Sequence, residues 1–214
     1  MPLVLHKIIE PHANLAVWHI QESNEELLNS LGKNYFENEH HVKINQANAR
    51  HYLASRILLT ELFPKHQIVL TKNENNKPSL QLDGKPFSIS ITHSFDYAAI
   101  LIAETGHLGL DLEKIDNRIG RVKHKFMNQE ELAFAGEEDQ IKAQTLIWST
   151  KETLYKIYSN KELDFKKNLH ISAFTIQENG LLKTNIINET MNQEIWVQYQ
   201  QIDQYFLTYS SLKN

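Results

Sequence analysis

The chain has 214 residues, a length that allows one large domain or two small ones. Hydrophobic residues make up 41% of it and charged residues 22%, which is typical of a globular protein rather than a disordered or fibrous one. It contains no cysteine and has a net charge of −4. Disulfides, thiolate zinc sites and a cysteine nucleophile are therefore excluded, and general nucleic-acid binding is not expected.

The N-terminal segment MPLVLHKIIEPH contains a short apolar run that His6 and Lys7 interrupt. It lacks the basic leader, the long apolar core and the small-residue cleavage site of a signal peptide. No stretch of the sequence approaches the ~18 consecutive apolar residues of a membrane span. We therefore expect a cytoplasmic protein without a membrane segment, which also fits the absence of cysteine.

The first half of the sequence predicts a strand, then helices, then several strands. We expect a strand at 15–20, a short helix at 25–31 and a long helix at 46–63, where apolar residues recur at helical spacing until Pro64. Short strands are expected at 67–70 and 80–82. An alternating strand at 87–92 and a buried strand at 98–103 complete this half.

The second half repeats this order. A strand is expected at 106–115, and Asn128 with Glu131 three residues later signals the start of a helix that breaks near Gly136. A stronger helix is expected at 140–158, followed by strands at 170–177, 180–187, 194–202 and 205–212. We predict an α+β fold of two similar halves, 1–105 and 106–214. Because no low-complexity linker separates them, we expect them to pack as one rigid unit.

Two carboxylates stand two residues apart in the predicted strand GLDLE, at Asp111 and Glu113. Such residues project from one face of a strand, with their roots about 6–7 Å apart. Two hard oxygen ligands at this separation can share one Mg²⁺, whose other positions take water and phosphate oxygens. Gly109 leaves room for a phosphate or for a neighbouring backbone. The alternative is a strand whose solvent-facing side is simply acidic.

The segment WSTKETLYK lies within the strong helix and places Trp148, Glu152 and Lys156 in one stripe. Lys151 and Tyr155 form an adjacent stripe. The pattern allows Glu152 to complete a magnesium shell and Lys156 to hold a phosphate or leaving-group oxygen. It equally allows a tryptophan at the edge of the core beside an i,i+4 salt bridge.

Three further features carry polar donors but little information when taken singly. SITHS places Thr92 and His93 at the end of a strand, the turn Asn76-Lys77-Pro78 carries a cation, and Arg50 lies on the first long helix. Each of these residues can equally be an ordinary surface side chain.

A local excess of positive charge follows the GLDLE strand. One acid, Asp116, faces five basic residues: Lys114, Arg118, Arg121, Lys123 and Lys125. The segment is either a solvated helix face or a docking site for an acidic partner.

In their order along the chain, four motifs resemble those of the 4′-phosphopantetheinyl transferases of the two-halved, surfactin-synthetase-activating type. GLDLEKI resembles the family's G-[IV]-D-[IV]-E motif, and WSTKETLYK resembles W-x-x-K-E-[AS]-x-x-K at the spacing that the family has. ISITHS resembles I-[ST]-H-S, and NKP resembles the G-[KR]-P turn before it. The resemblance covers the chain from about Arg50 to about Lys156.

This resemblance implies a pseudo-twofold pair of α+β halves with coenzyme A in the cleft between them. It implies that Asp111, Glu113 and Glu152 bind magnesium together with the pyrophosphate of coenzyme A. Lys156 would contact the transferred phosphate, and Lys151 would lie along the same side of the cofactor. Thr92 and His93 would reach the 3′-phosphate end or nearby phosphate oxygens, and Arg50 and Lys77 would supply charge around the adenosine.

The resemblance also implies the reaction of a holo-[acyl-carrier-protein] synthase. A serine hydroxyl of an apo acyl or peptidyl carrier protein attacks the β-phosphate of coenzyme A, and adenosine 3′,5′-bisphosphate leaves. Such a phosphoryl transfer depends on charge neutralisation and alignment. Glu152 is the first candidate to accept the serine proton, with a metal-bound water as the alternative.

Carrier proteins are usually acidic around the modified serine, so the segment from Lys114 to Met127 is the expected docking site. Phe126 and Met127 would add apolar contacts there. We expect a monomer, because one chain contains both halves. The identity of the carrier is not encoded in any motif.

The chain departs from the family pattern at several positions. His51 stands where a small hydroxyl residue often follows the arginine, and Phe126-Met127 replaces a double aromatic. The N-terminal lysines expected at the 3′-phosphate have no clear match, and no motif singles out Lys33 or Lys43 for that role.

Two other functions remain open, a magnesium-dependent hydrolase of phosphate esters and a catalytically inactive carrier-binding module. The hydrolase would not explain the four motifs in order, and the intact acidic and basic residues argue against an inactive module. A hydrolase would consume coenzyme A alone, whereas the transferase requires a carrier protein.

Overall fold

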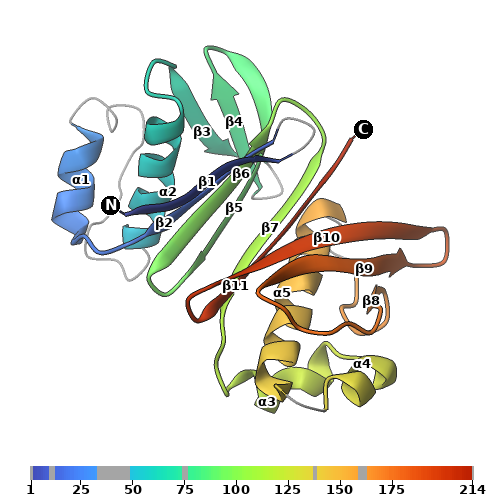
Figure 1. Ribbon diagram of the computed structural model, residues 1–214. Coiled ribbons are helices and arrows are strands. Elements are labelled where there is room, and N and C mark those ends of the chain that lie inside the picture. The colour runs from blue at the N-terminus through green and yellow to red at the C-terminus, as the bar shows by residue number, and fades with distance from the viewer. Residues whose placement is uncertain are drawn as a thin grey trace. The chain divides into compact units, whose positions relative to one another are not determined.

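The structure, a computed structural model, describes residues 2–9, 13–32, 49–73, 77–136, 139–158 and 163–213. The chain divides into two compact units, Met1–Thr105 and Gly106–Asn214 (Figure 1). Each unit contains one antiparallel sheet and its own helices. The predicted α+β class is confirmed.

The first unit contains a six-stranded sheet of order β1-β2-β6-β5-β4-β3. Helix α2 packs against β2 and β6 and beside α1. The elements are β1 (Leu3–Ile9), β2 (Ala13–His19), α1 (Asn24–Leu31), α2 (Ala49–Leu62), β3 (Ile68–Lys72), β4 (Pro78–Leu82), β5 (Lys85–Ser94) and β6 (Tyr97–Ala103).

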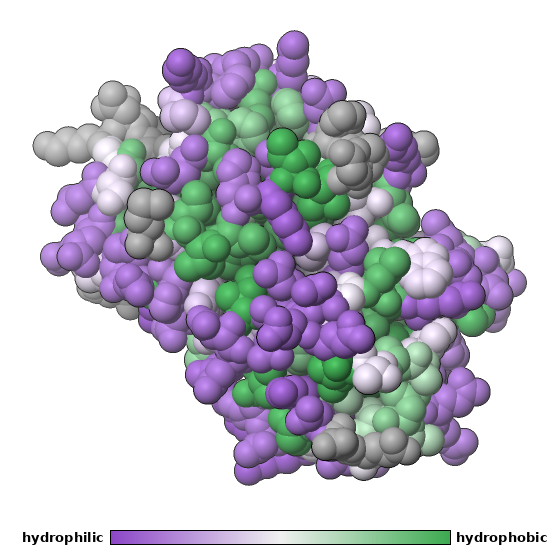
Figure 2. Space-filling model, viewed as in Figure 1, coloured by the Kyte–Doolittle hydropathy of each residue, from purple (hydrophilic) through white to green (hydrophobic). Residues whose placement is uncertain are grey.

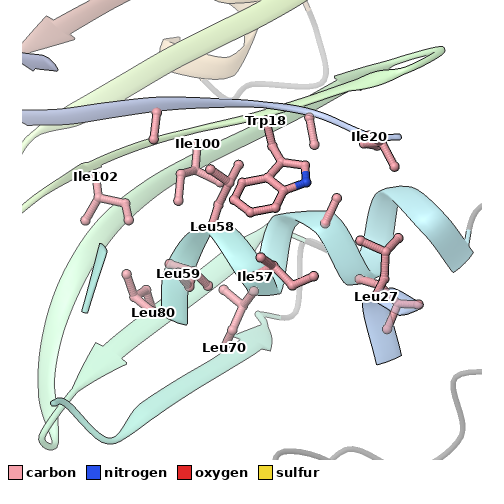
Figure 3. Packing of buried hydrophobic residues seen from close by; sticks show 14 of the residues in the cluster. Trp18, Ile20, Leu27, Ile57, Leu58, Leu59, Leu70, Leu80, Ile100 and Ile102 are labelled. Carbon is pink, nitrogen blue, oxygen red and sulfur yellow. The ribbon is translucent and has the colours of Figure 1, made fainter. Parts of the chain in front are cut away.

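One hydrophobic cluster joins α2 to this sheet. Ile57, Leu58 and Leu59 of α2 are buried in it together with Trp18 of β2 and Ile100 of β6 (Figure 3). Full burial of an aliphatic or aromatic side chain of this kind contributes about 1.5–3 kcal/mol. The helical spacing of the apolar residues in 46–63 therefore reflects the side of α2 that covers the sheet. Residues 46–48 of the predicted helix lie outside the described residues.

The second unit contains a five-stranded sheet of order β7-β11-β10-β9-β8. Helix α5 packs against β7 and β11, and apolar clusters surround it on several sides. The elements are β7 (His107–Lys114), α3 (Ile119–Val122), the 3₁₀ helix η2 (Lys123–Lys125), α4 (Gln129–Phe134), α5 (Gln140–Tyr158), β8 (Leu169–Ile171), β9 (Asn179–Ile187), β10 (Asn192–Ile202) and β11 (Tyr205–Leu212).

The two units share one connectivity. In each of them a strand leads into helices, the last helix packs on the sheet, and four strands follow. The strand order β2-β6-β5-β4-β3 therefore corresponds to β7-β11-β10-β9-β8, with β1 as an additional edge strand in the first unit. The prediction of two similar halves is confirmed at the level of topology.

Several local predictions can be compared with the structure. Helix α5 and strand β11 have the predicted bounds. Asn128 and Glu131 form the predicted capping box, with Asn128 Oδ1 accepting a hydrogen bond from Glu131 N at 2.8 Å and Glu131 Oε2 accepting one from Asn128 N at 2.9 Å. Strand β1 was not predicted, and of the strand predicted at 170–177 only its first residues are extended, within Leu169–Ile171.

The surface is mixed in polarity. The face seen in Figure 2 carries hydrophilic side chains interspersed with hydrophobic ones, without one colour covering it. Among the apolar side chains that stay exposed are Val4 and Ile8 on edge strand β1 and Trp196 on β10. Within the described part of the chain, no helix has both the length and the apolar character needed to cross a membrane.

Candidate active site

Gly109 sets how closely helix α5 approaches strand β7. A Cβ at this position would overlap the carbonyl oxygen of Thr153 and lie 2.6 Å from Ile157 Cγ1. Glycine is thus required because the α5 backbone occupies the space that a side chain would need. The sequence allowed Gly109 to leave room either for a phosphate or for a neighbouring backbone, and in the structure the neighbouring backbone fills this space. This close contact brings the segment WSTKETLYK of α5 next to Asp111.

Asp111 is held by two side chains of α5. Lys156 Nζ donates to Asp111 Oδ1 at 2.8 Å and also to the carbonyl oxygen of Leu110 at 2.8 Å. Ser149 Oγ donates to Asp111 Oδ2 at 3.0 Å. Because the Asp111 side chain is only 6% exposed, these contacts stabilise a charge that burial alone would disfavour. The predicted proximity of Asp111 and Lys156 is present.

A buried hydroxyl network fixes Ser149 against the sheet. Its Oγ lies 2.8 Å from Thr208 Oγ1, and Thr153 Oγ1 lies 2.7 Å from the same Thr208 oxygen. Thr208 pairs directly with Asp111 across β7 and β11. Sequence reasoning missed Ser149 and Thr208, because the two residues are 59 positions apart and only the packing of α5 on β11 brings them together.

Glu113 and Glu152 stand beside Asp111 in a half-buried region. Burial raises the pKa of Glu113 to about 7, assisted by the Asp111 carboxylate and opposed by a hydrogen bond from Trp148. Burial also raises the pKa of Glu152 to about 7, with the Asp111 carboxylate adding to the effect and Lys156 opposing it. Three crowded carboxylates near one lysine therefore form a site that favours added positive charge.

Lys151 has a different place from the one predicted. Its side chain is fully buried, and Nζ donates to Glu131 Oε2 at 2.7 Å, to Phe126 O at 2.8 Å and to Phe165 O at 2.9 Å. The expectation that Lys151 lies along the cofactor is therefore wrong for this structure. An ammonium group has three N–H donors, and all three of them are already used inside the protein.

Trp148 connects this interior to the carboxylates. Its Nε1 donates to Glu113 Oε1 at 3.0 Å. Its ring packs against Phe126, with centroids 5.0 Å apart and planes at 61°, and stacks on Phe165, with centroids 5.4 Å apart and planes at 26°. We call Phe126, Trp148 and Phe165 the aromatic stack. A cavity of about 420 Å³ lies beside it, with Val122, Lys125 and Asp164 as its other lining residues.

The comparison with known families concerns this second unit. Residues 107–210 match the family model described as the 4′-phosphopantetheinyl transferase superfamily. Nearly the whole of the second unit is therefore similar to that superfamily. A curated relative, the 4′-phosphopantetheinyl transferase AcpT of Salmonella typhimurium, is 32% identical over 111 residues, which is 49% of this chain and 56% of the relative. The aligned part of the chain thus spans little more than half the length of that relative.

Magnesium, which the superfamily resemblance implies, fits the donor chemistry of this unit. Asp111, Glu113 and Glu152 supply hard carboxylate oxygens, and the pKa values of the two glutamates are raised first by burial and then by the Asp111 carboxylate, whose charge a divalent cation would offset. As placed, no three histidine, aspartate or glutamate side chains among the described residues are gathered closely enough to hold a metal ion.

Only part of the basic segment of the second unit lies on the surface. Arg118, Arg121 and Lys125 are exposed, and Arg118 Nη2 pairs with Asp116 Oδ2 at 2.9 Å. Phe126 and Met127 are 1% and 0% exposed and belong to the core. The expectation that these two residues add apolar contacts to a docking surface is therefore wrong, while Arg121 and Lys125 lie exposed as the docking hypothesis requires.

The other predicted site residues lie in the first unit, around the end of β5. Arg50 Nη2 donates to Asp96 Oδ1 at 3.2 Å and to Ile20 O at 3.0 Å. The rings of His51 and His93 stack with centroids 4.3 Å apart, and a nitrogen of His51 lies 2.6 Å from Phe95 O. Arg50 and His93 thus lie in one neighbourhood at the end of β5. Asp96 also belongs to it, although the sequence contained no signal for that residue.

Two further predicted residues of the first unit have less informative surroundings. Thr92 is buried in β5. The backbone N–H of Lys77 donates to Asn73 Oδ1 at 3.0 Å, and burial lowers the pKa of its side chain. Asn76 of the predicted turn lies outside the described residues, as do Lys33 and Lys43.

Proposed function

We propose that this protein is a 4′-phosphopantetheinyl transferase of the holo-[acyl-carrier-protein] synthase type. It would transfer the 4′-phosphopantetheine group of coenzyme A to a serine of an apo carrier protein and release adenosine 3′,5′-bisphosphate. The observation that carries this proposal is the grouping of Asp111, Glu113, Glu152 and Lys156 within the superfamily unit.

The carboxylates of this group are the proposed ligands of Mg²⁺. Asp111, Glu113 and Glu152 are all oxygen donors, which suits a hard cation better than a soft one. Bound there, Mg²⁺ would supply positive charge that offsets the charge of the coenzyme A pyrophosphate.

Lys156 and Glu152 have proposed roles in the transfer itself. Lys156 carries an ammonium group beside Asp111, with its side chain 28% exposed, and would bind a phosphate oxygen of coenzyme A. Glu152, whose pKa burial raises to about 7 in the metal-free protein, would accept the proton of the attacking serine, with a metal-bound water as the alternative acceptor. Positioning and charge neutralisation supply most of what a phosphoryl transfer requires.

For the first unit, contacts of Arg50, Lys77, Thr92 and His93 with coenzyme A stay a prediction. One observation supports the Arg50 neighbourhood. Arg50 Nε and His51 Nδ1 are buried without a hydrogen-bond partner among the described residues. Buried polar atoms without partners are costly, and a ligand offering acceptor atoms would satisfy them.

The proposed protein substrate is an acidic carrier. The exposed Arg121 and Lys125 and the half-buried Lys123 would attract the acidic surface around its serine. Electrostatic attraction of this kind mainly increases the rate of association and fixes orientation.

The experiment that separates the proposed transferase from a hydrolase follows the nucleotide product by chromatography. The protein is incubated with coenzyme A and Mg²⁺, with or without an apo carrier protein. Adenosine 3′,5′-bisphosphate that forms only when the carrier is present supports the transferase. Formation of the nucleotide from coenzyme A alone would favour a hydrolase, and no product with several unrelated carriers would favour an inactive binding module.

A further inference from the structure

The buried ion pair between Lys151 and Glu131 has no part in the chemistry proposed above. Both side chains are 0% exposed, and their charged atoms lie 2.7 Å apart. Glu131 also accepts hydrogen bonds from the backbone N–H of Asn128 at 2.9 Å and of Ile171 at 3.1 Å. Burying two charges is expensive, and well-packed apolar residues often stabilise a fold equally well. The contacts of the pair therefore suggest a purpose other than stability.

The Lys151 ammonium holds two backbone segments that are far apart in the sequence. It binds the carbonyl oxygen of Phe126, just before α4, and that of Phe165, in the segment after α5. The rings of these two residues are the neighbours of the Trp148 ring in the aromatic stack. Because Trp148 lies three positions before Lys151 on α5, both side chains project from the same side of the helix. One ammonium group thus fixes both neighbours of the indole.

The indole in turn contacts a carboxylate of the proposed metal site. Trp148 Nε1 donates to Glu113 Oε1 at 3.0 Å. Outer hydrogen bonds of this kind orient metal-binding carboxylates, and their removal typically weakens metal affinity by about 10–100-fold. The position of the Glu113 carboxylate therefore depends on where the aromatic stack holds the indole N–H.

We propose that the Lys151–Glu131 pair is a positioning pair, which acts through the aromatic stack to orient Glu113 for metal binding. The inference rests on the proposed function, since it requires Glu113 to be a metal ligand. Lys151 touches neither cofactor nor substrate in this account. Trp148 is the residue that transmits its effect.

The first test compares metal binding by the full chain and by a Trp148→Phe variant. Phenylalanine keeps an aromatic ring in the stack but removes the indole donor. Mn²⁺ binding, measured by electron paramagnetic resonance with coenzyme A present, should weaken about tenfold. The matched control is Trp196→Phe, because Trp196 Nε1 also donates to a glutamate, Glu194, at 3.1 Å but on the exposed side of β10. Unchanged Mn²⁺ affinity in Trp148→Phe would overturn the proposal.

The second test removes the ion pair without leaving a buried charge. In the double variant Lys151→Met with Glu131→Leu, the protein should stay folded but bind Mn²⁺ more weakly than the wild type. Three tryptophans give three indole N–H resonances, and only that of Trp148 should shift strongly in a ¹⁵N correlation spectrum. A folded double variant with wild-type Mn²⁺ affinity and an unshifted Trp148 signal would show that the pair is merely structural.

The outcomes also separate this inference from the proposed function. If the wild-type protein binds no Mn²⁺ with coenzyme A present, both the metal site and the positioning role are overturned. If it binds Mn²⁺ but modifies no carrier, the transferase proposal fails while the metal measurements still decide the role of the pair. Transferase activity with the metal affinity unchanged in both variants overturns the positioning role alone.

Discussion

Lys156 Nζ lies 2.8 Å from Asp111 Oδ1, so the lysine proposed to bind phosphate is paired with a proposed metal ligand. The pair joins α5 to β7, and Ser149 donates to the other carboxylate oxygen of Asp111. A bound phosphate would be attracted to the lysine of this pair, and a bound cation would be attracted to the aspartate. This relationship makes the two residues the first targets for mutation.

Replacing Lys156 with methionine should lower kcat for carrier modification by about 10²–10³-fold, the usual effect of losing one charge-stabilising donor. The fold should persist, since the Lys156 side chain is partly exposed. Steady-state kinetics at saturating coenzyme A measure the effect. Lys142→Met, which removes an exposed lysine of the same helix paired with Asp139 at 3.7 Å, is the control. Equal rates in the two variants would exclude a role for Lys156 in the transfer.

The metal-free protein should lose stability as the pH rises from 4.5 to about 7, the ordinary and raised pKa values of Glu113 and Glu152. A carboxyl with a raised pKa binds its proton more tightly in the folded than in the unfolded state. Its contribution to stability is therefore full below pH 4.5 and is lost as the pH approaches about 7. Above that pH, Mg²⁺ should restore stability by binding the ionised carboxylates.

Thermal unfolding at pH 5 and pH 8, with EDTA or with Mg²⁺, measures this effect. Histidines also titrate in this range, so the informative quantity is the difference between the wild type and Glu113→Gln. The variant should show a smaller fall in Tm between the two pH values and a smaller gain from Mg²⁺. The same fall in both proteins would mean that Glu113 is not the group responsible.

Substituting alanine for Gly109 should lower the free energy of unfolding by about 1–3 kcal/mol, as other overpacked sites do. The added Cβ overlaps the Thr153 carbonyl oxygen and forces α5 away from β7. Gly120→Ala is the matched control, because its Cβ would meet Gln144 Oε1 at an ordinary 3.5 Å. Urea denaturation of both variants tests the prediction. Similar stability of the two would mean that α5 does not need this close approach.

Reversing Arg121 and Lys123 to glutamate should raise the KM for an acidic carrier protein while leaving the KM for coenzyme A unchanged. Both lie in the basic segment that follows β7 and face away from the core. Lys65→Glu combined with Lys72→Glu alters net charge by the same amount and serves as the control. If both double variants raised the KM for the carrier protein equally, the effect would come from overall charge and not from docking at this segment.

Elements with strong local patterns were predictable from the sequence. In helix α5, apolar residues recur at helical spacing over nineteen residues. The capping signal at Asn128 depends on a partner only three positions away. Strand β1 was missed because two consecutive polar residues, His6 and Lys7, interrupt its apolar residues, so that the segment resembles two short apolar runs rather than one strand. At 170–177 the residues have strand propensity, but only Leu169–Ile171 pair with β9.

The candidate site was predictable where its residues share one element or one motif. Asp111 and Glu113 lie on one strand, and Glu152 and Lys156 on one helix. The burial of Lys151 was not predictable, because its partner Glu131 and the two carbonyl groups come from segments that only the fold brings together. For the same reason, the sequence did not show that Phe126 and Met127 are buried in the core instead of lying on the surface.

The most direct test of the central claim is the intact mass of an apo acyl carrier protein after incubation with this protein, coenzyme A and Mg²⁺. A transferase should increase the mass of the carrier by about 340 Da, the mass of one phosphopantetheine group delivered by phosphoryl transfer. EDTA and Asp111→Ala should each abolish the gain. An unchanged mass with several unrelated carriers, from folded protein that binds coenzyme A, would contradict the assignment of a transferase.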